Sequence, residues 1–479
     1  MLTRLAVRGF KNLAQIDIRF GPLTCITGPN GAGKSNLFEA IAFLAALAEQ
    51  PLADAALAAC RGNVHGEGVD DLFFRRGDQL ADSMSFLAEM VVPAKGLDAL
   101  GQPAEASMTL LRYELELGRL PASPDRPGGG LAILREELDA LHRTTARRSL
   151  GFRHKKPWRQ SVVLGRRAHP YLSTQIEDGR REITIHQDSG ARTHTLSAEA
   201  LPCTVLSSAR SAFAHPTLLL ARQELAGWRH LRFEPSALGA PDRADTPPGL
   251  RSDGGHLAAT LHHLARRRDR SEDGGADALY SHLAARLDAL LGGVRSFHVQ
   301  ADPVRGHLDM VLTDARGTAH HARALSDGTL RTLALAALEV DPGAGGLVCL
   351  EEPASGIHPQ GMPALLAQLQ ALAVDTRQPC GPSNPLRQVI LASYSPALLA
   401  GIPDEDLLLA RNLDSASFSW KQGTWRDEGA EEDPRSIHAE AWDELFRQQG
   451  VRGPVEAPIR RGKDLSEAPR KQVSLFAGG

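Results

Sequence analysis

The pattern of apolar and polar positions divides the chain into buried strands, amphipathic helices and an irregular C-terminal stretch. The runs at 23–27 and 347–350 are almost continuously apolar, which is typical of parallel strands buried on both faces of a sheet. Segments 181–187 and 192–196 alternate around Asp188-Ser189-Gly190, which predicts a β-hairpin. The pattern therefore predicts an α/β fold.

The same pattern excludes a long coiled coil. No apolar heptad continues for the roughly three or four repeats that a coiled coil requires. The best candidate, the run of leucines from Leu131 to Leu141, fits a short helix and a strand followed by a helix equally well. After Arg411 the pattern weakens, and from Gly450 the chain becomes rich in proline, glycine and charge, which predicts a flexible tail.

A glycine-rich stretch follows the first apolar strand. Residues 28–35 fit the phosphate-binding loop pattern G-x-x-x-x-G-K-[ST], and the apolar residues of 37–47 then recur at helical spacing. The glycines allow consecutive backbone N–H groups to point at phosphates, and the helix adds the positive end of its dipole. The predicted ATP-binding residues are Gly28, Pro29, Asn30, Gly31, Ala32, Gly33, Lys34, Ser35 and Asn36.

Residues at two strand ends would supply the chemistry of hydrolysis. We expect Lys34 to reach the β- and γ-phosphates and Ser35 to place its hydroxyl on Mg²⁺. The strand at 347–350 ends in Glu351 and Glu352. Because ligands collect at the carboxyl ends of parallel strands, we expect Glu351 to hold Mg²⁺ through water and Glu352 to polarise the attacking water. The alternative is that both glutamates begin the next helix, where the helix dipole favours acids.

The order of these motifs resembles that of ABC-type ATPases. Ser326-Asp327-Gly328-Thr329 lies before the acidic strand, at the head of a helix-forming run, where that superfamily carries its signature. This variant is similar to the RecF and OLD-like branches rather than to transporter ATPases, and the run at 5–13 resembles the N-termini of RecF and SMC-type proteins. The resemblance implies that Ser326 and Gly328 cap the γ-phosphate bound by a second subunit, in an ATP-dependent homodimer.

The resemblance continues beyond the acidic strand, with one departure. Residues 354–359 fall at the D-loop of these ATPases, and 389–396 resembles their switch strand. Tyr394 stands where the family has a histidine that senses the γ-phosphate. A phenol donates a hydrogen bond but does not readily carry positive charge at neutral pH, so we expect slow turnover. His358 is either a substitute that faces the nucleotide or a turn residue.

The resemblance implies a split ATPase head formed by residues 1–45 and 300–412. Residues 46–299 would then form an inserted lobe of mixed α and β structure, and 413–479 a C-terminal extension with a flexible tail. Within the insert, 252–261 is similar to a helix entry of RecF-like ATPases, although any loop-to-helix junction has this composition. The acidic pattern of the OLD nuclease domain is absent after the switch strand, so we assign any DNA cleavage to a separate nuclease chain.

A basic segment within the insert is the candidate for DNA contact. Residues 143–167 contain nine arginines and lysines and no acidic residue, and Trp158 and His154 interleave with them as flat surfaces for bases. A solvated basic loop is an equally weighted alternative. The formal net charge of −3 means that any nucleic-acid footprint is local. The predicted DNA-binding residues are Arg153, Lys155, Lys156 and Arg159.

The C-terminal stretch contains a candidate docking peptide. Gln472-Val473-Ser474-Leu475-Phe476 resembles the peptide by which many bacterial proteins bind the replicative sliding clamp. The resemblance implies that Leu475 and Phe476 fill an apolar pocket of the clamp while Gln472 makes the orienting hydrogen bonds. The alternative is a tail that folds back onto its own head.

Composition limits the setting. No apolar stretch among the 479 residues is long enough to span a membrane, the first residues run into a strand pattern rather than a signal peptide, and the five cysteines show no paired spacing. These features predict a cytoplasmic protein. The predicted function is ATP hydrolysis that acts on DNA or licenses a separate effector subunit, in DNA repair or anti-phage defence. The alternative is an ATP-gated, dimerising adaptor with little hydrolysis, recruited through its tail; a transporter ATPase is disfavoured.

Overall fold

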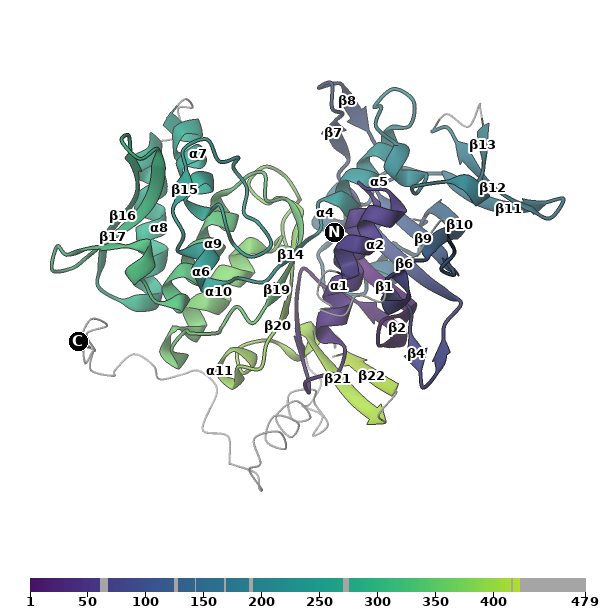
Figure 1. Cartoon of the computed structure of the whole chain (residues 1–479). Helices are drawn as coiled ribbons and strands as arrows, with labels where there is room; N and C mark the ends of the chain where they lie inside the picture. The colour runs from purple at the N-terminus through teal and green to yellow at the C-terminus, as the bar shows by residue number, and fades with distance from the viewer. Residues whose placement is uncertain are drawn as a thin grey trace.

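The computed structural model describes residues 1–60, 68–124, 128–142, 144–167, 169–188, 193–269, 275–414 and 417–422, with the backbone alone from 412 onward. Figure 1 shows two lobes with a parallel sheet between them. The predicted α/β fold is confirmed. No helix in the described ranges is long and apolar enough to cross a bilayer.

A six-stranded sheet lies at the centre of the molecule (Figure 1). Its strand order is β14 (Arg229–Leu231), β19 (Gly346–Glu351), β20 (Arg387–Ala392), β3 (Leu23–Thr27), β21 (Leu407–Asp414) and β22 (Ser417–Gln422). All neighbouring pairs are parallel except β21 and β22. The strands β3, β19 and β20 are buried along almost their whole length, because helices or a second sheet cover both faces. Their carboxyl ends therefore meet at one edge.

An antiparallel sheet of eight strands forms the core of one lobe. Its strand order is β13 (Thr193–Ser197), β12 (Arg180–His186), β11 (Leu172–Glu177), β10 (Gly130–Ala140), β9 (Leu110–Leu120), β6 (Ser83–Val91), β1 (Leu2–Phe10) and β2 (Leu13–Arg19). The predicted hairpin is confirmed as the antiparallel pair β12 and β13. The leucine run from Leu131 to Leu141 lies mostly on β10, which decides that ambiguity in favour of a strand.

One apolar core joins this antiparallel sheet to the central sheet. Helix α1 (Lys34–Leu47) contributes Phe38 and Phe43, and the rings of Phe43 and Phe10 on β1 stack with centroids 5.7 Å apart. The same cluster includes Cys349 of β19 and Ile390 of β20. Helices α2 (Leu52–Cys60) and α5 (Pro216–Ala226) complete this layer. The helix after the glycine-rich loop is thus held between two sheets.

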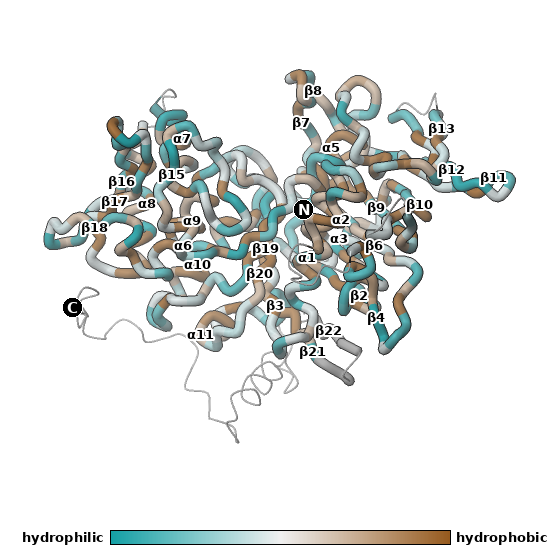
Figure 2. The backbone as a smooth tube through the Cα atoms, in the orientation of Figure 1, coloured by the Kyte–Doolittle hydropathy of each residue, from teal (hydrophilic) through white to brown (hydrophobic). Residues whose placement is uncertain are grey.

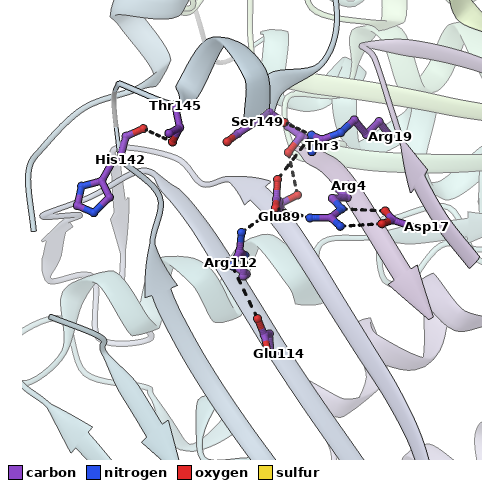
Figure 3. A network of polar contacts seen from close by, with 10 residues as sticks. All are labelled: Thr3, Arg4, Asp17, Arg19, Glu89, Arg112, Glu114, His142, Thr145 and Ser149. Carbon is purple, nitrogen blue, oxygen red and sulfur yellow. Dashed lines mark hydrogen bonds and ion pairs between the residues drawn. The ribbon is translucent and has the colours of Figure 1, made fainter. Parts of the chain in front are cut away.

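The other face of the antiparallel sheet carries a network of polar contacts around Glu89 (Figure 3). Glu89 on β6 is only 2% exposed and lies among three arginines. Its carboxylate is 3.0 Å from Arg4 on β1, 3.2 Å from Arg112 on β9 and 3.7 Å from Arg19 on β2. A buried charge requires such compensation. The network therefore ties β1, β2, β6 and β9 together on the face opposite the main apolar cluster.

The second lobe combines a small antiparallel sheet with a group of helices. The sheet contains β15 (Asp242–Arg243), β16 (Val294–Asp302), β17 (His307–Asp314) and β18 (Ala319–His321). The helices are α7 (Leu257–Asp269), α8 (Gly275–Leu291), α9 (Asp327–Val340) and α10 (Met362–Leu372). Their inward faces form a second apolar cluster, and Figure 2 shows brown, hydrophobic segments along the helices and the central strands.

The remaining elements are short. The strands β4 (Arg75–Arg76) and β5 (Gln79–Leu80) form one small pair, and β7 (Lys95–Leu97) and β8 (Pro103–Glu105) form another. The short α-helices are α3 (Ala146–Leu150), α4 (Lys156–Val162), α6 (Pro235–Leu238) and α11 (Pro396–Leu399). Single 3₁₀ turns occur at Val69–Leu72, Ala198–Ala200, Leu206–Ser208, Ala322–Ala324, Pro359–Gly361 and Asp404–Asp406.

The expected division into a head and an insert does not follow the sheets. Strands β1 and β2, from residues 1–45, pair in one sheet with strands from residues 46–299, and β14 from the latter range pairs with β19 of the central sheet. The buried side chain of Gln388 on β20 also links the two sheets, because it accepts from the Leu2 N–H at 2.8 Å and donates to the carbonyls of Leu2 and Gly21. Both stretches of sequence therefore build one structural unit.

Candidate nucleotide-binding site

The glycine-rich loop connects β3 to α1 at the carboxyl edge of the central sheet. Gly28, Gly31 and Gly33 have φ values of 137°, 78° and 86°, which side chains rarely adopt. A Cβ at Gly28 would collide with the Ala410 carbonyl oxygen on β21. Gly33 precedes α1 and supplies no capping side chain, so the first N–H groups of the helix are available to an anion.

Lys34 lies inside this loop. Its ammonium donates to the carbonyl oxygens of Gly28 at 2.6 Å and Pro29 at 2.7 Å, and the residue is 7% exposed. Burial lowers the pKa of Lys34 to about 8, against the opposing attraction of Glu352 and Glu351. A phosphate in the loop would give this desolvated ammonium a full counter-charge in place of two neutral carbonyls.

Tyr394 and two asparagines hold the loop from outside. The Tyr394 ring centroid lies 4.3 Å from the Lys34 ammonium, and its hydroxyl donates to Asn30 Oδ1 at 2.5 Å. Burial and the two nearby glutamates raise the pKa of Tyr394 to about 12, so its hydroxyl remains a donor. Asn36 donates to Asn12 Oδ1 at 2.6 Å, and Asn12 donates to the Gly31 carbonyl at 3.2 Å. Sequence reasoning missed Asn12, since a turn asparagine carries no local signal of its partner.

Glu352 enters the site from the end of β19. Its φ of 46° is uncommon for a residue with a side chain, and its N–H donates to the Ala392 carbonyl at 2.9 Å. Oε2 accepts long bonds from the Tyr394 N–H at 3.4 Å and the Ser393 hydroxyl at 3.5 Å, whereas Oε1 is buried without a hydrogen-bond partner. Burial raises the pKa of Glu352. An orphaned carboxylate oxygen at a strand end is suited to binding a water molecule.

Glu351 is engaged by two residues that sequence reasoning missed. His230 Nε2 donates to Oε1 at 2.9 Å, while Arg232 donates to Oε1 at 2.9 Å and to Oε2 at 3.0 Å. Burial opposes ionisation of Glu351, but these hydrogen bonds and charges outweigh it and lower its pKa to about 2. Both donors come from β14 and the residue after it. Nothing in their local sequence reveals that β14 pairs with β19.

The alternative interpretation of the two glutamates is wrong. β19 extends to Glu351, residues 353–356 form a turn, and the next helical element begins only at Pro359. The helix dipole therefore does not explain the pair. His358 is exposed, and its Nδ1 accepts from the Gln360 N–H at 3.3 Å, as expected for the turn role rather than for a group facing the nucleotide.

The signature residues lie in the other lobe. Ser326 caps α9 by accepting from the Thr329 N–H at 3.2 Å, and Figure 1 shows α9 separated from α1. A Cβ at Gly328 would collide with the Gly356 carbonyl, so the helix start sits directly on the D-loop segment. Arg331 strengthens this contact by donating to the Ser355 carbonyl at 3.0 Å. Within the described chain, Ser326 hydrogen-bonds to Thr329 and not to the glycine-rich loop, so its role toward a second subunit stays a prediction.

The basic segment is only partly as expected. Trp158 is fully buried and packs against Phe152 and His154 with ring centroids 5.5 and 5.8 Å away, so the prediction that it offers a flat surface to bases is wrong. Burial also lowers the pKa of His154. Arg153, Lys155 and Lys156 are exposed and Arg159 is half-buried, around the start of α4, whereas Arg167 is tied to backbone carbonyls. Arg143 lies outside the described residues.

The candidate clamp peptide, with Gln472, Leu475 and Phe476, also lies outside the described residues. Most residues after Arg411, the part of the chain that lacks the acidic pattern of the OLD nuclease domain, lie outside them as well. Both expectations therefore rest on sequence alone.

The residues present fit a magnesium nucleotide better than a metal held by protein alone. Among the described residues, no group of three or more histidine, cysteine or acidic side chains is arranged to hold a metal ion. Mg²⁺ commonly uses one or two carboxylates and takes its other ligands from phosphates and water. Ser35 at the exposed start of α1 and the carboxylates at the end of β19 are a donor set of that kind.

Two family models match the chain. The model for the RecF/RecN/SMC N-terminal domain matches residues 1–55, and one described as an AAA domain, putative AbiEii toxin of a type IV toxin–antitoxin system, matches residues 194–400. The DNA replication and repair protein RecF of Magnetococcus marinus is 60% identical over 45 residues, which are 9% of this chain and 12% of that protein. The OLD nuclease of Thermus scotoductus is 56% identical over 41 residues, 9% of this chain and 8% of that protein. The matches thus span about a tenth of these relatives.

Solved structures give a distant likeness. An SMC head bound to the C-terminal winged-helix domain of ScpA aligns with a TM-score of 0.46 and 12% identity, over 88% of this chain and 97% of that one. The SMC head domain from Thermotoga maritima aligns with a TM-score of 0.36 and 13% identity, over 88% and 98%.

Replacing Tyr394 with phenylalanine tests how the loop is held. We expect the ring to remain over Lys34 while the bond to Asn30 is lost, so affinity for a fluorescent ATP analogue should fall by about two- to tenfold, as for one hydrogen bond. Tyr394→Ala should weaken binding further, because it also removes the ring. Fluorescence anisotropy measures both, and equal affinities of wild type and Tyr394→Ala would contradict a role for this side chain.

Proposed function

We propose, from the premise that this chain is an ABC-type ATPase of the RecF/SMC/OLD-like branch, that it binds ATP through residues 28–36 and hydrolyses it. The observation that carries the proposal is the convergence of the glycine-rich loop, Glu352 and Tyr394 at the carboxyl ends of β3, β19 and β20. Three neighbouring parallel strands bring the glycine-rich loop with Lys34, a phenol and an orphaned carboxylate to one edge.

Each residue then has a defined task. Lys34 exchanges the carbonyls of Gly28 and Pro29 for phosphate oxygens. Glu352 orients the attacking water through its unpartnered Oε1 and accepts its proton. Ser35 and Glu351 would hold Mg²⁺, which when bound supplies positive charge to the phosphates. Tyr394 donates a hydrogen bond where the family uses a histidine.

The active form would be a dimer. Ser326 and Asp327 are exposed at the start of α9, a 14-residue helix whose first turn carries the positive end of the helix dipole. We propose that this helix start in one subunit completes the nucleotide site of the other. Because Gly328 contacts Gly356, docking of α9 on the other subunit would be coupled to the segment that follows Glu352.

Changing Glu352 to glutamine tests hydrolysis. The amide keeps the shape but loses the base, so steady-state ATP turnover should fall by about 100-fold or more while nucleotide binding persists. With ATP present, this variant should be dimeric in light scattering. Glu177→Gln, at an exposed position on β11, is the control and should leave turnover unchanged. Equal turnover in wild type and Glu352→Gln would contradict the enzymatic role.

Turnover and light scattering also distinguish hydrolysis from the alternative function. An ATP-gated adaptor would dimerise with ATP yet show little turnover in the wild type. Tyr394 is the observation that favours it, because a phenol does not carry positive charge and its raised pKa keeps the hydroxyl protonated, so that it cannot act as a base. A monomer in the presence of ATP would contradict both functions.

We also propose that the protein acts on DNA or licenses a separate nuclease or effector subunit. The names of the RecF relatives support a role in DNA replication and repair, and the name of the OLD nuclease supports a link to nucleic-acid cleavage. The anti-phage setting rests on the sequence resemblance. The surface at the start of α4, with Arg153, Lys155 and Lys156 exposed beside the positive end of the helix, is the proposed contact.

Neutralising Lys155 and Lys156 tests this surface. If both contact phosphates, the slope of log K against log salt should become shallower by roughly 1 to 2 in the double alanine variant. Titrations of labelled duplex DNA at several salt concentrations measure it. Arg75 and Arg76, an exposed pair on β4, provide a matched double-alanine control. An unchanged slope would show that Lys155 and Lys156 do not contact DNA phosphates.

Recruitment to a sliding clamp remains a proposal from sequence. Alanine at both Leu475 and Phe476 should reduce binding to purified clamp at least about tenfold, because the two side chains would be the apolar anchors. Surface plasmon resonance with full-length protein measures this. Undiminished binding of the variant would contradict recruitment to the clamp through these two side chains.

A further inference from the structure

Arg232, the residue directly after β14, contacts Glu351, the carboxylate proposed to hold Mg²⁺. β14 pairs in parallel with β19, with Leu231 opposite Leu350, so Arg232 and Glu351 follow at equivalent positions. The Arg232 guanidinium forms a two-pronged contact with the Glu351 carboxylate, at 2.9 and 3.0 Å. Paired donors of this geometry fix the plane of a carboxylate as well as its charge.

The lone pairs of Glu351 are largely occupied. A carboxylate offers about four acceptor positions. Arg232 takes two and His230 a third. A water molecule of a hydrated Mg²⁺ would have to approach the same group while the guanidinium remains beside it, and two cations at one carboxylate repel each other. Binding of the metal therefore competes with this ion pair.

The two donors differ in how firmly they are held. The Arg232 side chain is 53% exposed, and its further electrostatic attraction to Glu39 of α1, which pairs with Lys11, and to Glu234 is weaker than that to Glu351. His230 is 15% exposed and packs edge-on against Phe38 of α1, with ring centroids 5.4 Å apart. Arg232 is free to leave, whereas His230 is confined.

We propose that Arg232 is a positioning residue that latches Glu351 in the nucleotide-free protein and must release it when a magnesium nucleotide binds. His230 stays in place and keeps its hydrogen bond to Glu351. Arg232 thereby sets how much Mg²⁺ the site requires. The inference rests on the proposed ATP site and adds that Mg²⁺ must compete with the Arg232–Glu351 ion pair.

The test is a Mg²⁺ titration of nucleotide binding. Purified full-length protein, freed of metal with a chelator, is mixed with a fluorescent non-hydrolysable ATP analogue, and anisotropy is followed as MgCl₂ is added. For Arg232→Gln we expect the half-saturating Mg²⁺ concentration to fall by about two- to fivefold, the range expected for losing one partly exposed ion pair. Arg232→Lys keeps the charge without the paired donors, so its half-saturating Mg²⁺ concentration should lie between those of wild type and Arg232→Gln.

Arg243→Gln is the matched control. Arg243 also makes a two-pronged contact with a carboxylate, Asp245, but in the small sheet of the other lobe, and its removal should leave the Mg²⁺ requirement unchanged. An unchanged or higher requirement in Arg232→Gln overturns the latch, and a higher one would make Arg232 a support that the metal site needs. Failure of the wild type to bind the analogue at any Mg²⁺ concentration would instead contradict the proposed ATP site.

Discussion

The parallel pairing of β3, β20 and β19 is the constraint on which the candidate site depends. These strands are buried on both faces, so their backbone groups must be paired within the sheet, and their registers are fixed by the apolar layers above and below. Because the strands run in one direction, the residues that follow them lie along one edge. Residues more than 300 positions apart, such as Lys34 and Tyr394, meet there with a ring-to-ammonium distance of 4.3 Å.

The loop geometry follows from that arrangement. α1 begins directly after β3 and is packed between the two large sheets, so the loop between them has little freedom to change its path. Glycine is required where the loop passes the Ala410 carbonyl on β21. Lys34 and Glu352 are both desolvated, and each lacks a full opposite charge in direct contact. Such groups cost stability unless a ligand compensates them, and this pattern is typical of functional sites.

The second lobe is connected to the site through backbone contacts. Gly328 at the start of α9 lies against Gly356, and Arg331 binds the carbonyls of Ser355 and Phe233 at 3.0 and 3.4 Å. Phe233 follows Arg232, and Ser355 lies three residues after Glu352. These contacts link α9 to the segments that follow Glu352 and Arg232. This connection gives a physical route by which a partner at α9 and a nucleotide at α1 would influence each other.

The sequence by itself determined the elements whose signals are local. The glycine-rich loop, the apolar strands with their terminal acids, the β12–β13 hairpin and the helix that begins after Ser326 each follow from neighbouring residues, because turn geometry, strand burial and helix periodicity act over a few positions. Only the tertiary structure decided which distant groups meet. It buried Trp158, placed Asn12 beneath the loop and set Arg232 and His230 on Glu351. Those contacts depend on which strands are neighbours, and the pairing of β14 with β19 is fixed by the packing of whole layers rather than by any residue along either strand.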